Sequence, residues 1–177
     1  MQRGFTLAEM IAVVAIVSVL SVLAVYGVRK YVFAAKSSEA IHMIGLIKAA
    51  QETYRDETFS YLPVSDSLDA YYPHDPTAEP QKKAAWTNTS HGDYGNWRVL
   101  GVQADAPVEF GYACIAGAAT APNANIGTVD RPTWDWPDNN EPWYVIKAVA
   151  DRDGDGMLAI FVGSSFTSEV YAEREAE

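Results

Sequence analysis

The chain is poor in the residues that most often carry covalent or metal chemistry. Its 177 residues include one cysteine, Cys114, which excludes an intramolecular disulfide. Cys114 lies in an apolar run, so the sequence favours a buried structural thiol over a nucleophile. No Gly-x-Ser-x-Gly segment and no phosphate-binding glycine loop occurs, and the three histidines share no spacing typical of a metal site: His42, His74 and His91. The sequence therefore provides no case for an enzyme.

Basic residues and early prolines are also scarce. The chain has 13 lysines and arginines against 23 aspartates and glutamates, for a formal net charge of −10. An acidic exterior keeps a secreted domain soluble and argues against nucleic-acid binding. No proline occurs before Pro63, so nothing interrupts a helix in the first third of the chain.

The longest uncharged stretch runs from Met10 to Val28 and is apolar on every face. As a helix these residues would span about 29 Å, the thickness of one hydrocarbon core. Arg29 and Lys30 follow it, and one acid, Glu9, precedes it. A carboxylate near bilayer depth is costly, so Glu9 is either a helix-start acid that complements the helix dipole or a functional charge that awaits a cationic partner.

The N-terminal residues carry a family resemblance. Met1 to Gly4, then Phe5-Thr6-Leu7-Ala8-Glu9-Met10 and the apolar run, resemble the start of type IV prepilins and pseudopilins. The joint match of leader, Gly4, Phe5 and Glu9 is more specific than a generic signal anchor requires. A cleaved secretory signal fits poorly, because no small-residue cleavage site follows the apolar run. The resemblance implies a leader over residues 1–4, cleavage between Gly4 and Phe5, N-methylation of Phe5, and an assembly role for Glu9.

The resemblance also implies a function and a location. We expect a structural subunit of a type IV pilus-like filament, which is anchored in the bacterial inner membrane as a prepilin and later forms a periplasmic or extracellular filament. Its partners would be other pilins and the prepilin peptidase and methyltransferase. A pseudopilin of a type II secretion system is the alternative, and a signal-anchored envelope enzyme is the outside alternative. Many pilins carry a proline in the membrane helix and a C-terminal disulfide, and this chain has neither.

The resemblance and the residue pattern agree on an α+β, pilin-like fold. One helix is expected from about Thr6 to Glu57, with residues 5–29 as the transmembrane and filament-core half. Its second half is amphipathic, with Ile41, Ile44, Ile47 and Tyr54 on the apolar face, and belongs to a soluble domain over residues 30–177. A Pro- and Gly-rich loop over 61–95, with a short helix near 65–71, precedes an antiparallel sheet. The expected strands are 97–102, 108–116, 143–149 and 157–163, with a long surface loop over 117–142.

The segment from Asp151 to Gly156 alternates carboxylates with other residues and contains two glycines. Asp151, Asp153 and Asp155 are the ligand type that calcium prefers, and the spacing resembles the first half of an EF-hand loop. The closing glutamate is missing, because Val162 occupies its place. Some pilins and pseudopilins bind calcium in C-terminal loops. A calcium site that orders the C-terminal hairpin is one reading, and an acidic hairpin turn is the other.

Overall fold

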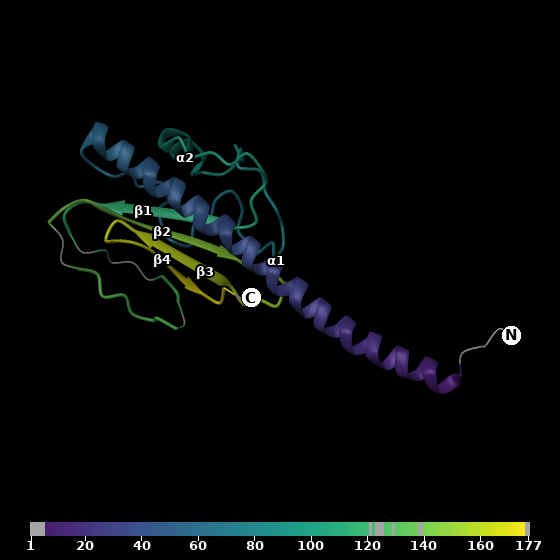
Figure 1. The fold of residues 1–177 in the computed structure, drawn as a ribbon. Helices are drawn as coiled ribbons and strands as arrows, with labels where there is room; N and C mark the ends of the chain where they lie inside the picture. The colour runs from purple at the N-terminus through teal and green to yellow at the C-terminus, as the bar shows by residue number, and fades with distance from the viewer. Residues whose placement is uncertain (1–5, 121, 123–125, 129, 138–139, 176–177) are drawn as a thin grey trace.

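The computed structural model describes residues 6–120, 122, 126–128, 130–137 and 140–175. A single 52-residue helix, α1 (Leu7–Thr58), packs with its second half across a four-stranded antiparallel sheet, and its first half projects away from the domain (Figure 1). The expected α+β, pilin-like architecture is confirmed. The helix begins and ends one residue later than the sequence predicts, because Thr6 caps it and Phe59 closes it in the left-handed conformation.

One stripe of α1 is buried against the sheet. Its fully buried positions recur every three or four residues, as an amphipathic helix requires; they are Ser37, Ala40, Ile44, Ile47 and Gln51. Ile41 had been expected on this face and is instead 44% exposed, because it lies outside the stripe. The two polar residues lie at the two ends of this stripe, where Ser37 donates to the Glu175 carbonyl and Gln51 donates to the Leu62 carbonyl.

The sheet is a meander in the order β1-β2-β3-β4. Its strands are β1 (Gly111–Gly117), β2 (Trp143–Ala150), β3 (Ala159–Ser164) and β4 (Thr167–Glu173). Residues 118–142 connect the first pair, the acidic loop connects the second, and a two-residue turn connects the third. Three of the expected strands are therefore present, with boundaries shifted by at most three residues.

Both faces of β2 and β3 are buried. On β2 the even-numbered residues Tyr144, Ile146 and Ala148 face α1, and the odd-numbered Val145 and Val149 face the opposite side. On that second side, Ile126, Trp134 and Trp136 from the connection between β1 and β2 pack with the strands in a second apolar cluster. A strand buried on both faces reads as a continuous apolar run instead of an alternating one.

The tryptophans of the long loop serve this packing. Trp134 and Trp136 stack with ring centroids 5.2 Å apart, and Tyr171 of β4 meets Trp134 edge-on at the same distance. The Arg131 guanidinium lies 4.2 Å from the centre of the Trp134 ring. The loop is therefore anchored to the sheet by aromatic contacts.

Two local predictions were wrong and one strand was missed. Residues 97–102 had been expected as a strand, but Tyr94–Leu100 is a helix, α2, which buries Trp97 and Leu100 on one face and ends at Gly101 with φ +77°. The short helix near 65–71 is replaced by bends and a turn. β4 had not been expected, because its residues are mostly polar and it lies at the edge of the sheet, half exposed.

Candidate functional site

The first half of α1 presents an apolar surface that the chain itself does not cover. From Leu7 to Val28 every large apolar side chain is at least 52% exposed. The segment has a mean hydropathy of 2.7 over its most apolar window, and by length and composition it can cross a membrane. Ser18 and Ser21 donate their hydroxyls to main-chain carbonyls one turn earlier, both at 2.7 Å. Lipid or the apolar helices of other chains are the surroundings that such a surface requires.

Thr6 and Glu9 form a reciprocal capping box at the start of this helix. The Glu9 carboxylate accepts from the Thr6 N–H at 2.7 Å and from the Thr6 hydroxyl at 2.8 Å, and the Glu9 N–H donates to the Thr6 hydroxyl at 3.3 Å. Both carboxylate bonds use Oε2. Glu9 therefore caps the helix and also complements its positive end. Gly4 and Phe5 lie outside the described residues.

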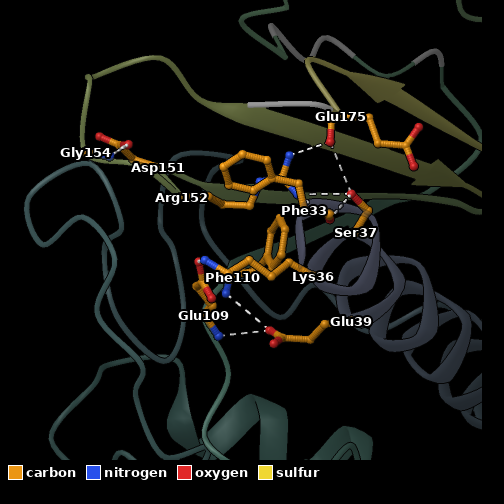
Figure 2. Close-up of polar contacts among 10 residues, drawn as sticks. All are labelled: Phe33, Lys36, Ser37, Glu39, Glu109, Phe110, Asp151, Arg152, Gly154 and Glu175. Carbon is orange, nitrogen blue, oxygen red and sulfur yellow. Dashed lines mark hydrogen bonds and ion pairs between the residues drawn. The ribbon is translucent and has the colours of Figure 1, made fainter. Parts of the chain in front are cut away.

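The helix meets the domain at a buried arginine. Arg152 follows β2, is 3% exposed, and donates to the main-chain carbonyl of Phe33 at 2.9 Å and to the Ser37 hydroxyl at 3.0 Å (Figure 2). Its other terminal nitrogen donates to the carbonyl of Glu175 at 2.5 Å. The guanidinium also lies 5.1 Å from the centre of the Phe33 ring. One side chain thus joins α1, the loop after β2 and the C-terminal segment.

A second set of polar contacts lies beside this arginine. The Lys36 ammonium is 2.6 Å from the Glu109 carboxylate, which is almost fully buried. One oxygen of Glu39 accepts from the backbone N–H groups of Glu109 and Phe110 at 2.9 and 3.3 Å (Figure 2). These bonds fix the chain that enters β1 to the side of α1. They position the helix on the domain just beyond its apolar half.

The acidic loop brings its three carboxylates together. One oxygen from each of Asp151, Asp153 and Asp155 lies within 4.8 Å of the other two. Two ligands held 2.3–2.6 Å from one calcium ion are separated by at most about 5 Å, so the donor set fits a calcium ion. Asp153 and Asp155 are exposed, and Asp151 is 5% exposed. The triad can therefore bind a metal, with two ligands open to solvent.

The same carboxylates also serve the backbone of the loop. Asp151 accepts from the N–H groups of Gly154 and Gly156 at 2.7 and 3.1 Å, with one oxygen each. Both glycines have φ near +85°, a conformation that favours glycine. Asp155 accepts from the Met157 N–H at 2.7 Å. The loop therefore has the hydrogen bonds of an acidic hairpin turn. Each carboxylate oxygen that accepts one of these bonds still has a second lone pair that could bind a metal.

Two other predicted features have clear positions. Cys114 is fully buried under α1, where the Gln51 amide donates to its sulfur at 3.3 Å, and burial raises the pKa of the thiol to about 12. It is a structural thiol, as expected. Val162 is buried within β3, and its side chain has no oxygen that could act as a ligand. The residues that position the helix and that sequence reasoning missed are Glu39, Glu109 and Arg152; their contacts between α1 and the rest of the domain join positions at least 70 residues apart.

The comparisons with known proteins identify the N-terminal segment. The family model for the prokaryotic N-terminal methylation motif matches residues 1–25, and this motif is typical of type IV pilins and pseudopilins. No curated protein and no solved structure matches the chain significantly. The exposed apolar helix and the motif are consistent with a membrane-anchored prepilin.

Proposed function

We propose that this chain is a structural subunit of a type IV pilus-like filament. The observation that carries the proposal is the exposed apolar half of α1, most of which lies within the matched methylation motif and which projects away from a folded domain. In the proposal residues 1–4 are a leader that is removed between Gly4 and Phe5, and the new amino group of Phe5 is methylated. The helices of many subunits then pack together and bury the apolar surface that Leu7 to Val28 expose.

The capping box supports a role for Glu9 in that assembly. Both bonds from Thr6 go to Oε2 of Glu9, and Oε1 makes no hydrogen bond within the described part of the chain. A carboxylate oxygen left open in this way can accept from the Phe5 amine of a neighbouring subunit. The pair would offset the cost of taking both charges out of water when the helices bundle.

Two variants separate this role from helix capping. Glu9→Gln keeps an amide oxygen that accepts from Thr6 but removes the charge, so the prepilin should be inserted and processed normally yet fail to enter filaments. Thr6→Val removes the capping hydroxyl and keeps the charge, so it should still assemble. The readout is electron microscopy of shed filaments together with cleavage of the leader on gels. Filaments from Glu9→Gln at the wild-type yield would overturn the pairing.

A pseudopilin of a secretion system is the second candidate. The chain shares with that class the methylation motif, and its lone cysteine leaves the C-terminal region without a disulfide. Abundant long fibres that contain this chain identify a major pilin, and trace amounts in fibres identify a minor one. A secretion defect without fibres, on deletion of the gene, identifies a pseudopilin. A signal-anchored envelope enzyme would instead show catalytic activity that persists in a variant that forms no filaments.

We further propose that Asp151, Asp153 and Asp155 bind calcium in the folded domain. The support is the convergence of three carboxylate oxygens and the two glycines that let the backbone turn tightly around them. Arg152, which lies between two of the ligands, turns away from them toward Phe33, so its charge does not neutralise the triad. A bound cation would relieve the repulsion among the carboxylates and order the hairpin between β2 and β3.

A further inference from the structure

The loop region over 73–91 contains a cavity of about 480 Å³ on the surface of the domain. Most of its polar lining side chains are basic or imidazole groups, in a chain whose overall charge is strongly negative. The titratable side chains that line it are His74, Glu79, Lys82, Lys83 and His91. None of these residues takes part in the methylation motif, in the apolar helix or in the acidic loop.

His74 is the unusual member of this lining. His74 is 7% exposed, and neither ring nitrogen makes a well-formed hydrogen bond, although the Lys82 backbone also interacts with the ring. Burial lowers the pKa of His74, so the ring is neutral at physiological pH and offers one N–H donor and one acceptor. Buried polar atoms without a full hydrogen-bond partner destabilise the folded state. The ring therefore lacks a partner that a bound molecule can supply.

The other lining groups are mostly donors. His91 accepts from the Asp93 N–H through Nδ1 at 3.1 Å, so the proton of its neutral ring is on Nε2. Lys82 pairs with Glu79, with both carboxylate oxygens at 2.7 Å, so these two charges cancel. Lys83 is exposed and forms no ion pair with any residue that the structure describes. The cavity thus combines one uncompensated cation with two imidazole N–H donors.

A metal ion does not suit this arrangement. Among the described residues, the histidines and the acids around this cavity do not bring three ligand atoms together, whereas Asp151, Asp153 and Asp155 do. The one carboxylate of the lining, Glu79, is already occupied by Lys82. Several N–H donors beside a free ammonium are instead the groups that hold an oxyanion.

We infer that this cavity binds a phosphate group through Lys83, His91 and His74. The phosphate can come from a lipid headgroup or from a soluble phosphoester. The position favours the lipid: Gln81 donates its N–H to the Asp151 carbonyl at 3.0 Å, and the next residue, Arg152, contacts α1 at Phe33. The segment that bears Lys82 and Lys83 therefore lies at the end of the domain from which the apolar half of α1 emerges (Figure 1).

The test uses the full-length chain with ¹⁵N-labelled histidine in maltoside micelles and phosphate-free buffer. Inorganic phosphate is added at constant ionic strength, with chloride as the matched anion, and the imidazole signals are followed by NMR. We expect the signals of His74 and His91 to shift saturably with one common Kd. His42, which lies on α1 outside this cavity, should not shift. Lys83→Gln should raise the Kd by about tenfold, and Arg98→Gln, which removes a charge from exposed α2, should change it less than twofold.

Nanodiscs distinguish the two sources of phosphate. If a lipid headgroup occupies the cavity, transfer into phosphatidylglycerol nanodiscs shifts His74 and His91 by itself, and added phosphate then has no further effect. If the ligand is soluble, the nanodisc leaves both signals unchanged and the phosphate titration persists. Equal responses to chloride and phosphate, or no shift at His74 in either arm, would overturn the inference without any variant having to fold. The phosphate titration does not depend on filament assembly, so its failure would not contradict the proposed filament function.

Discussion

A side-chain carbon placed on Gly163 of β3 would lie 2.6 Å from Cγ2 of Ile44 on α1. The glycine therefore lets the helix approach the sheet more closely than any other residue permits. Gly163 pairs with Ile146 of β2 and lies where the register between β3 and β4 shifts. This contact sets the distance between α1 and the sheet near the middle of the helix's buried half.

Gly163→Ala should consequently destabilise the domain by about 1–3 kcal/mol, because the added methyl group overpacks the interface between helix and sheet. The measurement is urea unfolding of the full chain in micelles, followed by tryptophan fluorescence. Gly45→Ala is the matched control: nothing lies within 4 Å of its added carbon, and it should stabilise α1 by up to about 1 kcal/mol. Equal stabilities of the Gly163 variant and the wild type would show that α1 can shift without cost.

Arg152→Met should cost about 2–4 kcal/mol of unfolding free energy. The replacement keeps most of the side-chain volume but removes the donors to Phe33, Ser37 and Glu175, which include buried or half-buried acceptors. Unfolding in urea measures the loss. Arg98→Met removes the same charge from an exposed position of α2 and should stay within about 0.5 kcal/mol of the wild type. A change no larger than that of the control would mean that Arg152 does not hold α1 to the domain.

We expect the buried Cys114 thiol to reduce the stability of the domain at alkaline pH. Its pKa is raised from an ordinary value of 9.0 to about 12 by burial. Above pH 9 the unfolded chain releases this proton while the folded chain keeps it, so the unfolding free energy falls as the pH rises toward 12. The slope from this group is at most about 1.4 kcal/mol per pH unit. Tyrosines titrate in the same range, so the measurement compares the wild type with Cys114→Ala, which should lose stability less steeply. Identical slopes would contradict the burial of the thiol.

Calcium should raise the melting temperature of the full-length chain by several degrees. Binding to the folded state alone contributes about 2.7 kcal/mol at a hundredfold excess over the Kd. The melts are run with calcium and with a chelator. Asp153→Asn combined with Asp155→Asn should abolish the difference, and Asp66→Asn combined with Asp105→Asn, two exposed positions outside the loop, should preserve it. If calcium leaves the wild-type melt unchanged, the loop is only a hairpin turn.

The sequence by itself determined the features that depend on neighbouring residues. The long helix was predicted to within one residue at each end, because the absence of proline, the apolar run and the spacing of Ile44 and Ile47 are all local signals. The methylation motif and the clustering of Asp151, Asp153 and Asp155 are equally local. Three strands were visible for the same reason, since β-branched and aromatic residues gather between turn residues.

Only the tertiary structure decided the contacts between distant segments. The 97–102 segment is as aromatic and β-branched as a strand, but its first four residues belong to α2, which buries Trp97 and Leu100 on one side. Periodicity over six residues cannot reveal this. Arg152 and Phe33 are 119 positions apart, and no local pattern indicates that an arginine in an acidic loop turns inward to a helix. Likewise, the His74 ring is buried only because the segments around it fold over it. The burial of a side chain and its hydrogen-bond partners depend on residues that are distant in the sequence, so only the folded domain determines them.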